Sequence, residues 1–232
     1  MQPLSRASTP IADRIEENLS ALDWQACQKC AREYRPFNLK DGVCFDCIGE
    51  AAFVRDRLQQ ILRPMLVTLA EKQFETTDAN SRAYIAARDF NPALDNLYLF
   101  GPPGHGKTHL ACKIVRRAIQ KRLSVLFLRP TEWLRSVRGL VGVEEQTAIN
   151  RACGHSVLVI DDLGVEKSTD FAITALFDLI EQRIMDGRNG LVVTSNLSLD
   201  ALSAKLGDDR LTSRLSGLCR VIELADRDRR QD

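Results

Sequence analysis

The sequence predicts an α/β fold with a parallel sheet, preceded by a small four-cysteine module. From residue 74 onward, short apolar runs alternate with helical stretches, a pattern typical of a parallel sheet covered by helices. Near the N-terminus, four of the seven cysteines form two closely spaced pairs. With 232 residues, 44% of them apolar, the chain can build one full domain and a small module.

The overall charge narrows the classes of function. Lys and Arg number 32 and Asp and Glu 31, for a net charge of +1, so any nucleic-acid surface must be local. No apolar run approaches the roughly 18 residues of a membrane span. The first residues also lack the apolar core of a signal peptide. We therefore expect a cytoplasmic protein without a membrane partner.

A phosphate-binding motif begins the alternating region. Residues 101–108 read GPPGHGKT, between an expected strand at 97–100 and an expected helix at 109–121. A glycine-rich turn at a helix N-terminus points backbone N–H groups at an anion. Lys107 would reach the outer phosphates of a nucleotide, and the Thr108 hydroxyl would hold Mg²⁺. The expected nucleotide-binding residues of this loop are Gly101, Pro102, Pro103, Gly104, His105, Gly106, Lys107 and Thr108.

The rest of the chain divides into further expected elements. The expected strands lie at residues 97–100, 125–128, 157–161, 191–194 and 219–224, and the clearest helix at 170–185. Residues 49–71 have helical periodicity, which Pro64 should kink or split. The expected domains are an N-terminal lead at 1–25, the cysteine module at 26–50, a helical linker at 51–73 and a nucleotide-binding domain at 74–232.

Polar side chains follow two of the expected strands. Asp161 and Asp162 come directly after a buried apolar run, at the end of the strand where ligands bind in open α/β sheets. Asp161 would contact Mg²⁺, directly or through water, and Asp162 would orient or deprotonate the attacking water. Asn196, after the next strand, could hydrogen-bond that water or the γ-phosphate. The alternative for Asn196 is a turn-forming residue at a strand end.

Two arginines near the C-terminus share one face of an expected helix. Arg210 and Arg214 are four residues apart. An arginine offered across a subunit interface can stabilise the charge of a phosphoryl group in transfer. The alternative is a pair of solvated surface arginines.

The cysteine pairs predict a structural metal site. Cys27 and Cys30 form one C-x-x-C pair, and Cys44 and Cys47 form the other. Four thiolates suit a closed tetrahedral zinc site, and metal binding would supply the folding energy of so small a module. The alternatives are a redox dithiol or an iron–sulfur cluster, although no thioredoxin-like βαβ unit is visible around the pairs. The three remaining cysteines are isolated and predict buried packing.

Residues 74–229 resemble an AAA+ ATPase of the DnaC/IstB group, which includes bacterial and phage helicase loaders. The motifs that carry the resemblance are Walker A at 101–108, Walker B at 157–164, sensor 1 at 193–196 and box VII at 209–215. The resemblance implies a sheet of order 5-1-4-3-2, binding of ATP and Mg²⁺, and assembly into a spiral or ring. Only eight residues follow the last expected strand, so we expect no helical lid.

The same resemblance assigns roles to individual residues. Arg214 matches the arginine finger that acts on a neighbour's nucleotide, and Arg210 a second box VII arginine. Among the residues of this chain, Arg229 is the best match to the sensor 2 arginine of the group. Asp162 stands where the group usually has Glu, and its shorter reach suggests slow hydrolysis.

The cysteine module bears on the partner. In helicase loaders of this group an N-terminal domain grips the hexameric replicative helicase, and the AAA+ domain senses ATP and single-stranded DNA; DnaI-type loaders carry zinc in that domain. IstB-type transposition helpers usually have a helical extension without four cysteines. The combination of a four-cysteine module with an AAA+ domain therefore favours a loader that acts in the initiation of DNA replication. The alternatives are a transposition helper and a nucleotide-gated adaptor with little ATP turnover.

A possible DNA contact follows the second strand. Trp133 could stack on a base, and Arg135 and Arg138 could touch phosphates. We prefer the interpretation that Trp133 packs in the core and that the arginines are solvated.

Overall fold

The computed structural model describes residues 25–34 and 39–225 and divides the chain into two compact units, Met1–Phe53 and Val54–Asp232. The two units are described separately below. The expected N-terminal lead lies almost wholly outside the described residues, and the expected domain boundaries stay predictions.

The described part of the first unit contains two short hairpins and the start of a helix. Strand β1 (Gln25–Ala26) pairs antiparallel with β2 (Glu33–Tyr34), and β3 (Leu39–Lys40) pairs antiparallel with β4 (Val43–Cys44). Among the described residues of this unit, the only buried side chains are Cys27 and Cys44. The described part of this unit therefore has no apolar core that could hold it together.

A proline separates the two helices that follow. Helix α2 spans Phe45–Ile61, and α3 spans Pro64–Glu71 with the proline in its first turn. Arg63 has an extended backbone, because the ring of a proline excludes the helical conformation for the residue before it. The predicted split at Pro64 is confirmed, and α2 begins four residues before the expected helix.

The second unit is built on a five-stranded parallel sheet. Its strands are β5 (Leu97–Phe100), β6 (Val125–Leu128), β7 (Val157–Leu163), β8 (Leu191–Ser195) and β9 (Arg220–Glu223). Their spatial order is β6-β7-β8-β5-β9, which confirms the predicted order 5-1-4-3-2 read from the other edge. In the described part of the chain β9 is the last element, and no helical lid follows it.

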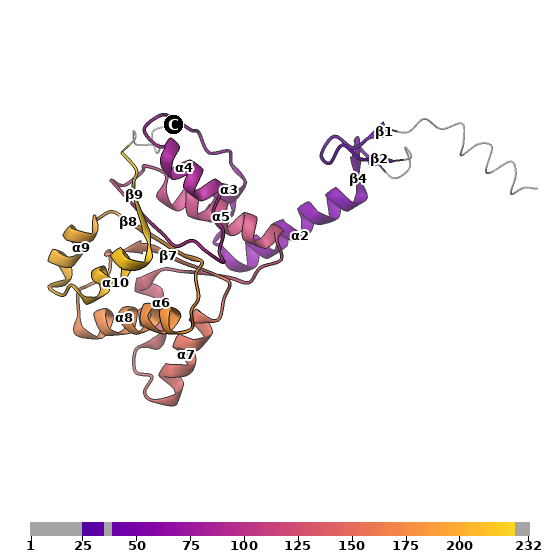
Figure 1. The fold of residues 1–232 in the computed structure, drawn as a ribbon. Coiled ribbons are helices and arrows are strands. Elements are labelled where there is room, and N and C mark those ends of the chain that lie inside the picture. Colours follow the sequence, from indigo (N-terminus) through magenta and orange to yellow (C-terminus); the bar gives the residue numbers. More distant parts are fainter. Residues whose placement is uncertain (1–24, 35–38, 226–232) are drawn as a thin grey trace, which may run out of the picture. The chain divides into compact units, whose positions relative to one another are not determined.

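Helices cover both faces of this sheet. The remaining helices are α4 (Ser81–Arg88), α5 (Lys107–Gln120), α6 (Pro130–Val137), α7 (Val143–Cys153), α8 (Asp170–Met185), α9 (Leu199–Leu206) and α10 (Arg210–Leu218). Helices α3, α4 and α5 lie on one face, and α6, α7, α8 and α10 lie on the other (Figure 1). Helix α8 has the predicted bounds, and α5 begins two residues earlier than expected.

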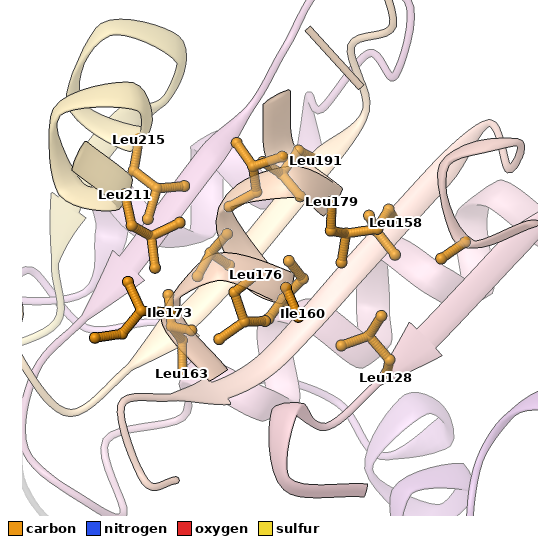
Figure 2. Close-up of a cluster of buried hydrophobic side chains, with 14 of the residues drawn as sticks. Leu128, Leu158, Ile160, Leu163, Ile173, Leu176, Leu179, Leu191, Leu211 and Leu215 are labelled. Carbon is orange, nitrogen blue, oxygen red and sulfur yellow. The ribbon is translucent and has the colours of Figure 1, made fainter. Parts of the chain in front are cut away.

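The core explains why the strands are continuously apolar. Leu158 and Ile160 of β7 pack with Leu176 and Leu179 of α8, and Leu211 of α10 extends the same cluster (Figure 2). Because helices cover both faces, neighbouring residues of a central strand are all buried, which a half-exposed strand would not allow. This packing fixes the edge of the sheet at which the polar residues near the C-terminal ends of β5, β7 and β8 meet. No helix among the described residues is long and apolar enough to cross a membrane.

Candidate functional site

The loop from Gly101 to Gly106 connects β5 to the N-terminus of α5. A Cβ atom on Gly101 would lie 2.2 Å from the carbonyl oxygen of Leu224, so only glycine fits where the loop passes β9. Gly106, the residue before α5, has a φ of 88°, which glycine adopts without strain. These two residues let the chain turn sharply into a helix whose first N–H groups are open to an anion.

Lys107 is held inside this loop. Its side chain is 5% exposed, and Nζ donates hydrogen bonds of 2.7 Å to the carbonyl oxygens of Gly101 and Pro102. A buried ammonium group needs such partners, because an unpaired buried charge is costly. The geometry therefore holds a cation beside the turn that would receive phosphates.

The Asp161 carboxylate joins three elements of the sheet edge. Its Oδ1 accepts a hydrogen bond of 2.9 Å from Thr108 Oγ1 in α5 and one of 2.7 Å from Thr194 Oγ1 in β8. Thr194 Oγ1 in turn accepts a hydrogen bond of 2.9 Å from the backbone N–H of Asp162. The two acids and the two threonines therefore form one connected network, which we call the Asp161 network.

The second oxygen of Asp161 has a different environment. Oδ2 is buried and has no hydrogen-bond partner among the described residues; Arg129 Nε lies 3.7 Å away and is also without one. Burial raises the pKa of Asp161, and the charge of Asp162 raises it further, against the hydrogen bonds from Thr194 and Thr108. A cation beside Oδ2 would favour the ionised form. Carboxylate and hydroxyl oxygens in this arrangement suit a divalent cation such as Mg²⁺.

A cavity of about 530 Å³ opens in front of this network. Asp162 and Asn196 both line it, and Asp162 has a left-handed backbone with a φ of 62°. That conformation is uncommon for a residue with a side chain, and it follows a register shift between β7 and β8 after Ile160. The lining consists of Met65, Leu66, Leu69, Lys72, Gln73, Glu75, Pro103, Gly104, Gly106, Lys107, Thr108, His109, Arg129, Asp162 and Asn196.

In the first unit, the four cysteine sulfur atoms lie within 4.8 Å of one another. Cys30 Sγ and Cys44 Sγ are 3.9 Å apart, close to the edge of about 3.8 Å of a tetrahedron with Zn–S bonds of about 2.3 Å. Backbone N–H groups point at the sulfur atoms: that of Cys44 donates to Cys27 Sγ at 3.3 Å, and that of Cys47 donates to Cys44 Sγ at 3.4 Å. The donor set and the spacing fit a metal ion.

The thiols of this cluster differ in acidity. The hydrogen bond from the N–H of Cys44 is the main cause that lowers the pKa of Cys27 to about 6. The hydrogen bond to the Cys44 thiol is the main cause that raises the pKa of Cys47 to about 12. Four thiolates so close together repel one another, and a bound cation would allow all of them to ionise.

The comparisons with known proteins assign the chain to a family. Residues 54–230 match the family model described as IstB-like ATP binding protein. The chain belongs to the IstB-like ATP-binding proteins. A curated protein named as an insertion sequence ATP-binding protein, from Sinorhizobium fredii, is 30% identical over 142 residues, covering 59% of this chain and 57% of that protein. The replicative helicase loader DnaC of Escherichia coli is 24% identical over 124 residues, covering 52% of this chain and 51% of that protein.

Solved structures confirm the AAA+ fold of this IstB-like chain. DnaI superposes with a TM-score of 0.58 at 21% identity, covering 72% of this chain and 94% of that one. Domain III of DnaA from Thermotoga maritima gives a TM-score of 0.58 at 23% identity, covering 72% of this chain and 70% of that one. The chain spans just over half the length of the two curated relatives above.

Not every predicted site residue reaches the cavity of the IstB-like domain. Of the loop, Pro103, Gly104, Gly106, Lys107 and Thr108 line it, together with Asp162 and Asn196. The carbonyl oxygens of Gly101 and Pro102 accept hydrogen bonds from Lys107. Asp161 is buried and accepts a hydrogen bond from Thr108. His105 points its Nδ1 at the carbonyl oxygen of Pro103, 2.9 Å away, and does not line the cavity. Arg229 lies outside the described residues.

The two predicted arginines of α10 also lie away from this cavity. Arg210 donates from Nη2 to Asp208 Oδ2 at 2.7 Å and stacks over the Phe177 ring at 5.5 Å. Arg214 Nε lies 2.8 Å from Glu181 Oε2. Both are exposed, and a role in a neighbouring subunit's site stays a prediction.

Sequence reasoning missed several parts of the cavity, among them Arg129, helix α3, the segment 72–75 that follows it, and His109. Arg129 follows β6 directly, and the rule that polar residues after parallel strands meet at one edge could have found it. Helix α3, taken as part of a linker, contributes Met65, Leu66 and Leu69 to the wall. This helix packs against α5, and the sequence contains no local signal for that contact.

The three isolated cysteines and Trp133 pack as the sequence predicts. Cys112, Cys153 and Cys219 are buried, and burial raises the pKa of Cys112 and of Cys219 to about 12, so these thiols are unreactive. Trp133 packs against the core, which confirms the packing interpretation.

Replacing Thr194 by valine tests the Asp161 network. The change keeps the shape of the side chain but removes a hydrogen bond to Asp161 and an acceptor for the N–H of Asp162. We expect a loss of about 2 kcal/mol in the free energy of unfolding, measured by urea denaturation. Thr147→Val, at an exposed position of α7, is the control and should change stability little. Equal stability of both variants would contradict the network.

Proposed function

We propose that this protein is an ATPase that uses nucleotide binding and hydrolysis to deliver a DNA-acting partner enzyme to DNA. The observation that carries the proposal is the Asp161 network at the mouth of a cavity whose wall also contains Lys107. The membership of the IstB-like ATP-binding family supports ATP as the nucleotide.

The phosphate loop would bind the phosphates of ATP, and the Asp161 network would bind Mg²⁺. The N–H groups at the start of α5 would hold the β-phosphate, and Lys107 would exchange its carbonyl partners for phosphate oxygens. Thr108 and Asp161 would hold Mg²⁺, which when bound neutralises phosphate charge. Met65, Leu66 and Leu69 would provide the apolar wall for the rest of the nucleotide.

Asp162 and Asn196 would act on the attacking water. Both line the cavity, and the Asp162 backbone is fixed by its hydrogen bond to Thr194. Asp162 would accept the proton of the water, and Asn196 would orient it. An aspartate reaches less far than a glutamate, so we propose slow turnover that rises when a partner or DNA adjusts the site.

Arg214 would complete the site of a neighbouring subunit in a spiral or ring, with Arg210 beside it and Arg229 as sensor 2. The exposure of Arg214 and its distance from its own chain's cavity support action on a neighbour. Its contact with Glu181 would be exchanged for a phosphate contact on assembly.

A mixing experiment tests hydrolysis and this action in trans. Lys107→Ala should abolish ATP binding, whereas Arg214→Ala should bind ATP without hydrolysing it. A mixture should regain turnover, because a Lys107→Ala subunit offers an intact Arg214 to a nucleotide held by its neighbour. Arg151→Ala, on the exposed face of α7, is the control with normal turnover.

Normal turnover by Lys107→Ala would contradict the phosphate-loop assignment, and a mixture without activity would contradict action in trans. If the wild-type protein binds ATP without hydrolysing it, the result would favour the alternative of a nucleotide-gated adaptor.

The cysteine cluster would hold a structural zinc ion with Cys27, Cys30, Cys44 and Cys47 as ligands. The sulfur spacing and the N–H groups directed at the thiolates support zinc. With only cysteines buried among the described residues of this unit, the metal would supply its folding energy.

For the partner, we propose first a hexameric replicative helicase that the protein loads onto single-stranded DNA. The support is a compact four-cysteine unit that precedes an AAA+ domain in the same chain, together with the similarity to the DnaC loader. The metal unit would be the grip on the helicase.

A second candidate is an ATPase that helps a DNA transposase. It is favoured by the higher identity to the insertion sequence ATP-binding protein, 30% against 24% for DnaC. The two candidates share the nucleotide site and differ in the partner that is captured.

The Cys27→Ser variant tests the metal and the partner together. It should lose its one zinc ion per chain, measured by mass spectrometry of the metal content. It should also lose capture of the helicase in a pull-down with ATP and Mg²⁺, while nucleotide binding stays normal. Cys219→Ser, in the other unit, is the control and should keep both.

Each readout has an outcome that contradicts the proposal. A zinc-free wild-type protein would favour a redox dithiol over the metal site. Capture of the transposase instead of the helicase by the wild-type chain would favour the second candidate.

A further inference from the structure

A second cavity lies beside α5, behind the nucleotide cavity. It has a volume of about 200 Å³, and we call it the basic hollow. Its lining consists of Gln73, Phe74, Tyr84, Lys113, Arg116, Arg117 and Gln120. Three of these residues are cations, and none of the lining residues among those described is acidic.

The cations belong to a strongly basic stretch of α5. Residues 113–122 contain five Lys and Arg residues and no Asp or Glu. Lys113, Arg116 and Arg117 donate hydrogen bonds to backbone carbonyl oxygens: to Ala70 at 3.2 Å, to Ala70 at 3.4 Å and to Ala87 at 2.8 Å. These contacts stabilise the carbonyl groups near the C-terminal ends of α3 and α4. Carbonyl groups carry no full charge, however, so they do not neutralise three cations.

The charge in the hollow is largely uncompensated. Among the described residues, none of the three cations forms an ion pair with an acid. Asp89, whose pKa Arg117 helps to lower, is itself bound by Arg88. Burial lowers the pKa of Lys113, and the charges of Arg116 and Arg117 lower it further. Cations that repel one another in a half-buried hollow would gain from an anionic ligand.

We infer that the basic hollow and the adjoining turn of α5 bind the phosphates of a nucleic-acid strand. Lys113 and Lys121 are eight residues apart, or about 12 Å along the helix axis. This length spans several phosphates of one strand, which follow each other at about 3.4 Å along a helical axis. The amide of Gln120 and the hydroxyl of Tyr84 add neutral donors. A row of cations without an intervening acid, with neutral donors beside it, fits a repeated phosphate better than the irregular charges of an acidic protein.

The position of the hollow links it to the nucleotide. Gln73 lines both cavities. Next to it, the Phe74 ring meets the His109 ring edge to face at 5.1 Å, and His109 Nε2 lies 3.1 Å from the carbonyl oxygen of Lys72. In the proposed complex, these residues would lie between ATP and the strand. The inference rests on the proposed function in that DNA is where the partner is delivered, and it names the surface that would contact it.

The test is the salt dependence of oligonucleotide binding. The double variant Lys113→Gln/Arg116→Gln removes two charges, and Arg151→Gln/Lys167→Gln removes two from exposed positions in α7 and in the loop before α8. Fluorescence anisotropy with a labelled oligothymidylate gives the dissociation constant at several salt concentrations. We expect the slope of log K against log salt to fall by about 1.4 in the first variant. The second variant should keep the wild-type slope.

Charge and structure are separated by Lys113→Arg/Arg116→Lys. This variant keeps both charges and should keep the wild-type slope and affinity, with all variants melting at similar temperatures. Equal slopes in the two glutamine variants would overturn the basic hollow, and so would weakened binding by the charge-conserving variant. Either result leaves the proposed ATPase and partner capture standing, because those are measured without DNA. A wild-type protein that binds no oligonucleotide would overturn both the hollow and the DNA-directed part of the proposed function.

Discussion

The buried carboxylate of Asp161 is the constraint on which the nucleotide site depends. It lies at the end of β7, fully buried, and it can stay ionised there only if groups from other elements stabilise its charge. Thr108 from α5 and Thr194 from β8 do so through hydrogen bonds. The strand order brings these groups together, because β8 lies between β7 and β5, the strand that leads into α5. Groups from α5, β7 and β8 thus meet at one buried charge at this edge of the sheet.

Much of this edge could be predicted from the sequence. The loop from Gly101 to Thr108 and the acids after residue 160 have local signatures, and parallel strands place their ends at one edge of the sheet. The split at Pro64 was also local, because proline acts on its own neighbours. What could not be predicted arises from packing between distant segments. The role of α3 as a cavity wall depends on its contact with α5, and the left-handed backbone of Asp162 depends on the register between β7 and β8.

The two units use opposite means of stabilisation. The nucleotide-binding unit buries mostly apolar strands between two layers of helices, and these form a large apolar core. The cysteine unit buries only Cys27 and Cys44 among its described residues, and its sulfur atoms are spaced for a metal. Most of the described side chains of the cysteine unit are therefore exposed, and few of them serve a core.

The most direct test of this account measures nucleotide binding to the full chain by calorimetry, with and without Mg²⁺. A non-hydrolysable ATP analogue is titrated into the wild type, into Asp161→Asn and into Asp200→Asn, an exposed control on α9. We predict that Mg²⁺ tightens binding to the wild type and to the control. In Asp161→Asn this tightening should be lost while binding without Mg²⁺ persists. The same Mg²⁺ effect in all three proteins would contradict the central role of Asp161.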